Sequence, residues 1–350
     1  MQKKNLRIIG LFILGILIIL FIVEYIGIQE TLEVLKNVRF SFLLLGIFTQ
    51  LFLFWLWGYR WKIILEAAKE KISVKSLYLS LFTGVLFNNI TPSAKTGGEP
   101  VRAYIVSRME SISLERAFAT VTADRVFDSF PYVILSLFSI FYLFFFKDIP
   151  AWVQYILVFA LFFAVFLLVM TIYLCVNLKT AERFILGAIN FVGRFFPKVK
   201  EYSHSVDEKL IAFNSTVLRI GKNKTAMAKA MLISFLMLFC GFFRVYFVFL
   251  AVGYNVSFIV PIIVTIIAIQ VNIVPLLPGG LGTTEGVMIL IFSIFGVSTA
   301  VSASVALLDR LLSYWFGIFI GSICFFYSNK SIKKENGKQM KLEIGEKRRF

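Results

Sequence analysis

Residues 88–100 read NNITPSAKTGGEP and break an apolar run that begins at Leu77. The run is shorter than the span of about 20 residues that a bilayer requires, so it predicts a broken or re-entrant helix. Backbone groups freed at membrane depth must be buried in protein or face a wet cavity. We therefore expect Asn88 and Asn89 either to cap the broken helix ends or to contact a substrate.

A second stretch of this kind occupies residues 272–285, which read NIVPLLPGGLGTTE and end the apolar run 259–274. Four short segments of the first half recur in the second half, in the same order and about 182–186 positions later. The matches are GYRW (58–61) with GFFR (241–244), NITP (89–92) with NIVP (272–275), GGE (97–99) with GG and the glutamate of 279–285, and DR (124–125) with DR (309–310). Ordered matches at one offset indicate an internal repeat.

The composition places the chain in a membrane. Hydrophobic residues make up 59% of it and charged residues 16%, against roughly 45–50% and about 25% in soluble domains. Apolar runs of span length recur at 8–23, 40–59, 130–146, 152–176, 228–252 and 301–327. The sequence therefore predicts an all-α, polytopic transmembrane helical bundle with two inverted repeats and paired broken or re-entrant helices.

One integral-membrane domain is predicted over residues 1–327. We expect a first transmembrane helix and linker (1–39), a first repeat (40–177), a cytoplasmic amphipathic loop along the membrane surface (178–224), a second repeat (225–327) and a basic cytoplasmic tail without regular structure (328–350). If the amino terminus is cytoplasmic and each break is a hairpin, the span ending near Arg60 runs inward and the span 228–252 runs outward. The two halves are then inverted, as in many secondary transporters.

The charge distribution predicts the orientation. The 36 Lys and Arg residues outnumber the 20 Asp and Glu residues, and the basic clusters flank apolar runs as cytoplasmic loops do. We therefore expect a multi-pass protein of a prokaryotic plasma membrane with both termini in the cytoplasm. The basic surface would face phospholipid headgroups, and nucleic acid is not an expected partner.

The sequence does not indicate a metal site or a catalytic site based on histidine. His204 is the only histidine, and Cys175, Cys240 and Cys324 all lie within apolar runs without metal-ligand spacing. A catalytic triad and a zinc site both need more than this. We expect no cofactor and no metal.

Charged side chains within the predicted spans are the candidates for function, because each costs roughly 2.5–3.5 kcal/mol at a helix centre. Arginine binds phosphate oxygens in bidentate fashion, and the glutamates could meet a cationic or hydroxylated headgroup. Alternatively, these residues form ion pairs that hold the helices together. The candidate headgroup site comprises Asn89, Pro92, Gly97, Gly98, Glu99, Arg102, Asp124, Arg125, Asp128, Arg244, Asn272, Pro275, Gly279, Gly280, Glu285, Asp309 and Arg310.

At these residues the chain resembles the flippase-like transmembrane domain of bacterial lysylphosphatidylglycerol synthases, which also occurs as stand-alone prokaryotic membrane proteins. The matching segments are 91–104, the Asp124-Arg125 pair with Asp128, and 275–286. The resemblance implies a polytopic domain that moves or binds lipids. The synthases carry a further membrane region and a soluble aminoacyl-transferase domain, whereas this chain ends at Phe350, so aminoacyl transfer is not implied.

Three functions remain open from the sequence. The leading hypothesis is a lipid flippase that moves an anionic or aminoacylated phospholipid, or an isoprenoid-linked lipid, between leaflets. The second is a membrane-embedded transferase that modifies a lipid. No nucleophile with an adjacent base is visible in the sequence, so we do not expect the protein to be an enzyme. The third is a non-catalytic partner of a separately encoded lipid- or glycosyl-transferase. The sequence leaves the oligomeric state open.

Overall fold

The computed structural model describes residues 13–21, 24, 27–91, 97–194, 206–271 and 277–347, and most of them are helical. After a helical segment at 13–21, the elements in chain order are α2 (Ile28–Lys36), α3 (Phe40–Ala67), α4 (Val74–Ile90), α5 (Gly98–Glu110), α6 (Leu114–Phe146), α7 (Ala151–Val176), α8 (Leu178–Gly193), α9 (Val206–Lys222), α10 (Lys224–Ala251), α11 (Ile259–Val271), the 3₁₀ turn η2 (Pro278–Gly280), α12 (Thr283–Ile294), α13 (Thr299–Arg310), the π-helical segment η3 (Leu311–Trp315) and α14 (Phe316–Lys347). The predicted all-α membrane bundle is confirmed.

Within the described residues, five helical stretches are long and apolar enough to cross a bilayer. They are α3, α6, α7, α10 and the continuous run from α13 through η3 into α14. Large apolar side chains on their outer faces are exposed, for example Tyr155 at 76% and Phe162 at 69% on α7. Such a belt is costly in water and is what a lipid-facing helix presents.

Helices α4 and α5 form a hairpin around the first break. The backbone N–H of Gly98, at the start of α5, donates to Oδ1 of Asn88, at the end of α4, over 2.7 Å. A Cβ on Gly98 would overlap the carbonyl of Gly84 in α4, so α5 runs back against α4 at close range. Asn88 thus has the capping role that its place at the break predicts.

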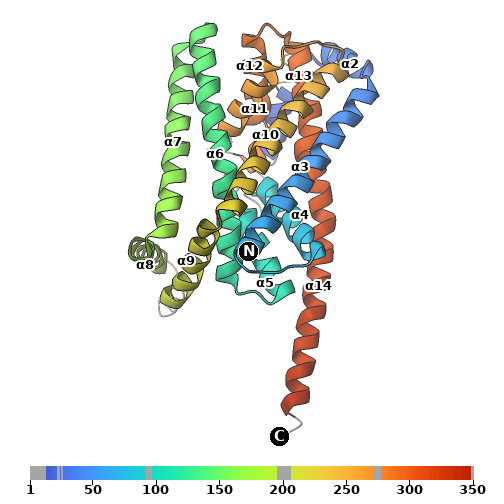
Figure 1. Ribbon diagram of the computed structural model, residues 1–350. Coiled ribbons are helices and arrows are strands. Elements are labelled where there is room, and N and C mark those ends of the chain that lie inside the picture. Colours follow the sequence, from blue (N-terminus) through green and yellow to red (C-terminus); the bar gives the residue numbers. More distant parts are fainter. Residues whose placement is uncertain are drawn as a thin grey trace.

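The two broken segments lie in opposite halves of the bundle. In Figure 1, α4 and α5 occupy the lower half, and α11 and α12 occupy the upper half. Their inner ends meet: the hydroxyl of Tyr314 donates to the carbonyl of Asn89 over 3.2 Å, and Gly279, with φ 55°, lies against both residues without room for a Cβ. The regions flanking the breaks therefore come together. Pro92 and Pro275 themselves lie outside the described residues.

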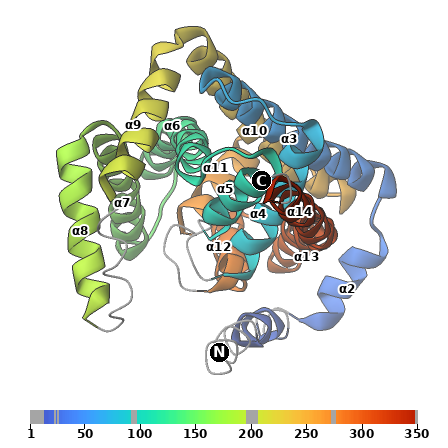
Figure 2. The same ribbon diagram turned by 90° about the horizontal axis from the view of Figure 1, so that it is seen from below.

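Helices α3 and α10 are antiparallel neighbours along one edge of the bundle (Figure 2). The backbone N–H of Arg39, just before α3, donates to the carbonyl of Ala251 at the end of α10 over 2.7 Å. Further along, the Nη1 of Arg60 donates to the hydroxyl of Ser234 over 2.7 Å. The corresponding spans of the two halves thus run in opposite directions.

Two apolar cores fill the ends of the bundle. The lower core joins α3, α4, α5, α6 and α10 around side chains such as Trp61, Leu81 and Val121. The upper core joins α6, α10, α11, α12 and α13 around side chains such as Phe249 and Phe292, whose rings meet edge to face at 4.8 Å. Most of the buried charges belong to the layer between the two cores, and this layer contains the candidate site.

Three local expectations need correction or refinement. Helix α3 continues to Ala67, so Arg60 does not end a span at the membrane interface but is buried at 1% exposure. The stretch 178–224 folds into α8 and α9, and α8 lies across the direction of α7 (Figures 1 and 2). The tail is helical to Lys347, because a preceding transmembrane helix removes the cost of nucleation for a Lys- and Glu-rich extension.

Candidate functional site

Asp124 of α6 is the centre of the first ion-pair cluster. Its Oδ1 accepts from the Nε of Arg60 over 2.8 Å, and its Oδ2 accepts from both terminal nitrogens of Arg102 over 3.0 Å. The indole N–H of Trp57 also donates to Oδ2, over 2.9 Å. All three charged side chains are at most 2% exposed, so one buried carboxylate holds α3, α5 and α6 together.

Arg102 has additional contacts that fix its plane. Its guanidinium lies 4.1 Å from the centre of the Trp61 ring and 5.2 Å from that of Trp57. Cation–π contacts of this kind are stronger when they are shielded from water. Arg102 is therefore enclosed by protein on several sides.

The first cluster extends to a second carboxylate on α5. The Nη2 of Arg125 pairs with Oε1 of Glu99 over 2.8 Å, and its Nη1 lies 3.6 Å from Oδ2 of Asp128. Asp128 also accepts from the Nη1 of Arg60 over 2.9 Å. Three arginines thus meet three carboxylates in this half, and the cluster is electrically balanced.

The second half contains a smaller cluster around Arg244 of α10. Its Nε and Nη2 donate to the two oxygens of Asp309 over 2.7 and 3.3 Å, which is a bidentate pair. Its Nη1 donates to Oε1 of Gln50 on α3 over 2.6 Å. Arg244 therefore links α13 of its own half to α3 of the other half.

Arg310, the neighbour of Asp309, forms the other pair of this half. Its Nε donates to Oε1 of Glu285 over 2.8 Å, and its Nη2 donates to the carbonyl of Gly279 over 2.8 Å. The guanidinium also lies 4.3 Å from the centre of the Tyr314 ring. Among the described residues, its Nη1 has no hydrogen-bond partner, so this guanidinium retains free donors.

Segments matched by the internal repeat make similar ion pairs. Arg60 binds Asp124 as Arg244 binds Asp309, each through Nε at 2.7–2.8 Å, although the two arginines are shifted by one position within their matched segments. The Asp-Arg pairs continue the match, because Arg125 binds Glu99 and Arg310 binds Glu285, each at 2.8 Å. The short sequence matches therefore correspond to equivalent contacts in space.

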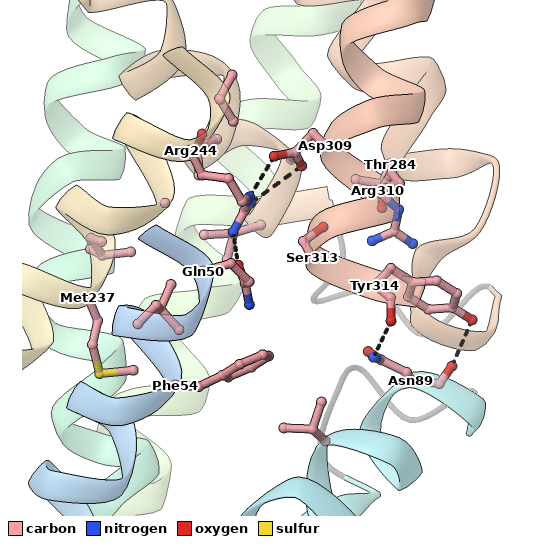
Figure 3. A pocket seen from close by; sticks show the side chains of 18 of the residues that line it. Gln50, Phe54, Asn89, Met237, Arg244, Thr284, Asp309, Arg310, Ser313 and Tyr314 are labelled. Atoms are coloured by element: carbon pink, nitrogen blue, oxygen red, sulfur yellow. Dashed lines mark hydrogen bonds and ion pairs between the residues drawn. The ribbon is translucent and has the colours of Figure 1, made fainter. Parts of the chain in front are cut away.

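A cavity of about 260 Å³ lies between the two clusters. Figure 3 shows α3 and α10 on one side of it, η3 with Tyr314 on the other, and Asn89 at the inner end of α4. Both halves contribute polar groups to its wall: Gln50, Asn88, Asn89, Arg125, Arg244, Thr265, Thr284, Asp309, Arg310, Ser313 and Tyr314. The remaining wall is apolar, as is usual in ligand sites.

The charges facing the cavity are unequal. Of the residues that the structure describes, Arg125, Arg244 and Arg310 line it with three guanidinium groups and Asp309 with a single carboxylate. Glu99 and Glu285, the partners of two of these arginines, are not part of the lining. The lining therefore contains more guanidinium than carboxylate groups, although each arginine has a carboxylate partner.

Five predicted site residues line the cavity, namely Asn89, Arg125, Arg244, Asp309 and Arg310. Other predicted residues support this wall from behind: Glu99, Arg102, Asp124, Asp128 and Glu285 lie in the ion pairs, and Gly97, Gly98, Gly279 and Gly280 lie at the starts of α5 and in η2. Pro92, Asn272 and Pro275 are outside the described residues. That any residue of the candidate site contacts a lipid headgroup stays a prediction.

Several residues of this layer are not among the predicted site residues. Arg60 was identifiable, because it belongs to the first match of the repeat. Gln50, Ser313 and Tyr314 lie on the cavity wall, and nothing in their local sequence distinguishes them from other residues of apolar helices. The π-helical segment that brings Ser313 and Tyr314 to the wall has no clear sequence signal, although such segments are frequent at functional sites.

In the described ranges, no three His, Cys, Asp or Glu side chains are grouped so that they could hold a metal ion. The chemistry of the layer is that of arginine, carboxylate, amide and hydroxyl groups. Such groups bind and orient an anion by charge-assisted hydrogen bonds.

Comparison with known proteins agrees with this architecture. The family model of the lysylphosphatidylglycerol synthase transmembrane region matches residues 7–321. The chain belongs to this family. The resemblance seen in the two Pro-Gly stretches is thereby confirmed, and the chain is a multi-pass membrane protein.

Relatives of similar length occur in archaea. A UPF0104 membrane protein of Methanothermobacter thermautotrophicus is 32% identical over 326 residues, which cover 93% of this chain and 96% of the relative. A UPF0104 membrane protein of Pyrococcus horikoshii is 31% identical over 332 residues, covering 91% and 97%. The match therefore extends over nearly the whole of these stand-alone family members.

Proposed function

We propose that this family member moves a phosphate-bearing lipid between the leaflets of a prokaryotic plasma membrane. The headgroup would cross through the central cavity while the acyl or isoprenoid chains remain in the surrounding lipid. The cargo would leave chemically unchanged. The excess of basic residues beside the apolar runs favours cytoplasmic termini.

The excess of guanidinium groups over carboxylates in the lining of the cavity carries this proposal. An anionic phosphate is attracted by the three guanidinium groups, and Arg310 has unused donors with which to bind it. Hydrogen bonds to charged groups contribute about 1.5–3 kcal/mol each. At about 260 Å³ the cavity is slightly smaller than a typical small-molecule site of roughly 300–1,000 Å³, so it suits a headgroup and not a whole lipid.

The relation between the halves also supports transport. The antiparallel α3 and α10 and the matched ion pairs are what an inverted repeat would produce. Transporters with such repeats bind their substrates where two broken helices meet near the bilayer midplane. The contact of Asn89 with Tyr314 and Gly279 joins residues that flank the two breaks, which supports such a plan.

Reconstitution into liposomes tests the proposal. Fluorescent phosphatidylglycerol, a polyisoprenyl phosphate and zwitterionic phosphatidylcholine are supplied separately, and leaflet exchange is followed by quenching of the outer leaflet. We expect exchange of at least one of the two anionic lipids well above that of protein-free vesicles, reduced at least about tenfold by Arg310→Ala.

Arg116→Ala is the matched control, since Arg116 forms only an exposed pair with Glu70 at 3.5 Å and should transport normally. Exchange of both anionic lipids at the protein-free rate would refute the proposal. A preference for one anionic lipid would identify the cargo class, because the phosphate is common to both and the remainder of the molecule differs.

A further inference from the structure

The two carboxylate oxygens of Glu285 have different surroundings. Its residue is 2% exposed, and Oε1 is bound to the Nε of Arg310 over 2.8 Å. Its Oε2 is buried and has no hydrogen-bond partner among the described residues. A buried oxygen of this kind is costly, and such groups often mark a functional requirement.

The surroundings of Glu285 contain few other charges. Arg310 of α13 binds it and lies against the ring of Tyr314 in η3, whereas Asp309, the neighbour of Arg310, is bound to Arg244 of α10. The neighbouring α11 and the segment 13–21, which approaches Gly282, contain no charged residue. Among the described residues, Arg310 is the ion-pair partner of Glu285.

Binding of an anion would disturb this balance. In the layer around the cavity, Arg125 is balanced by Glu99, Arg244 by Asp309 and Arg310 by Glu285. An incoming phosphodiester adds one negative charge that no described group neutralises. An uncompensated charge in this setting costs several kcal/mol, so uptake of a positive species together with the anion would lower the cost of binding.

We propose that Glu285 takes up a proton from water when Arg310 binds the phosphate of the cargo, so that the protein binds one proton with each anionic headgroup. This inference rests on the proposed function and adds its coupling ion. The proton neutralises the carboxylate that loses its share of Arg310, and the loaded layer is again without net charge. The proton gradient would thereby influence the direction of lipid movement.

The sign of the pH dependence follows from linkage. A complex that contains one more proton than the free protein is favoured as pH falls, and its affinity changes by up to about tenfold per pH unit. The probe must not titrate itself. Glycerophosphoglycerol, a water-soluble phosphodiester, has one negative charge between pH 5 and pH 9 and is suitable.

Calorimetric titration of the purified full chain with glycerophosphoglycerol, in two buffers of different ionisation enthalpy, counts the protons taken up. We expect one proton per bound phosphodiester in the unmodified protein. In Glu285→Gln, which resembles the protonated residue, we expect binding without proton uptake and with an affinity independent of pH. Glu66→Gln, which removes an exposed carboxylate paired with Lys62 at 3.8 Å, should retain the uptake.

Four results would overturn the inference. Binding without proton uptake in the unmodified protein refutes the coupling and leaves lipid transport standing. Uptake that persists in Glu285→Gln assigns the proton elsewhere. Uptake of Na⁺ in place of a proton, detected as Na⁺-dependent and pH-independent affinity, refutes the identity of the ion. If no phosphodiester binds while vesicles still exchange anionic lipid, the phosphate is not the group recognised, and both the inference and the cavity site fail.

Discussion

The two ion-pair clusters have the same pairs but different relations to the cavity. In the first half, Asp124 joins Arg60 and Arg102 behind two tryptophans, and only Arg125 of its charged residues reaches the cavity wall. In the second half, three of the four charged residues lie on the wall. The difference indicates that the first cluster holds the helices together, whereas the second is available to a ligand.

The largest effect on stability is expected from Asp124→Asn. The substitution leaves Arg60 and Arg102 buried without a full carboxylate partner, and breaking a buried pair costs about 3–5 kcal/mol. We expect little folded protein after detergent extraction, measured as the monodisperse fraction and by thermal unfolding. Asp124→Asn with the stability of the unmodified protein would contradict the structural role of the first cluster.

Two lysine substitutions distinguish the structural role of the first cluster from the ligand-binding role of the second. Lysine retains the charge but cannot make the planar, multidentate contacts of arginine. Arg60→Lys should lower the unfolding temperature, since Arg60 binds Asp124, Asp128 and Ser234 together. Arg310→Lys should instead reduce lipid exchange about tenfold or more, with a smaller change in stability.

The two clusters do not differ in role if Arg60→Lys and Arg310→Lys change stability and lipid exchange in the same way. Equal loss of stability would make both clusters structural. Equal loss of exchange in well-folded proteins would place the ligand across both clusters.

The close approach of α4 and α5 should be sensitive to a single methyl group. In Gly98→Ala the new Cβ would meet the carbonyl of Gly84, and relief of such overpacking costs about 1–3 kcal/mol. We expect a lower unfolding temperature and slower exchange. Gly187→Ala in α8 is the control, because a Cβ there has no atom within 4 Å; equal behaviour of the two variants would exclude a tight hairpin.

The smallest expected effect is that of Ser313→Ala. Ser313 lies on the cavity wall in η3, and its hydroxyl makes no hydrogen bond to a described residue. A hydrogen bond to an uncharged hydroxyl group of the headgroup contributes about 0.5–1.5 kcal/mol, so exchange should slow by roughly two- to tenfold at unchanged thermal stability. A loss of stability without a change in exchange would remove Ser313 from the headgroup site.

The sequence predicted the parts of the fold that hydropathy and chain breaks determine. The spans follow from apolar runs, and the break at residues 88–100 predicted the capping role of Asn88. The repeat placed Asp309 and Arg310 with Asp124 and Arg125, and the matched ion pairs agree with that placement.

Other features depend on tertiary contacts that no local pattern encodes. Which arginines face the cavity is decided by how the helices pack, and the sequence presented Arg102 and Arg310 as equivalent candidates. Arg102 is enclosed by Trp57 and Trp61, whereas Arg310 is on the wall. The helical continuation of α14 to Lys347 was also missed, because a polar composition alone does not reveal that a preceding helix will propagate.

The central claim is that an anionic headgroup passes the cavity beside Arg310. Its most direct test is lipid exchange by Ser313→Cys, in a protein whose three native cysteines are replaced, before and after reaction with a bulky, water-soluble thiol reagent. We expect that reaction of the new thiol reduces lipid exchange to the protein-free rate, and that added phosphatidylglycerol slows this reaction. Exchange that continues at the unmodified rate after complete reaction would contradict the central claim.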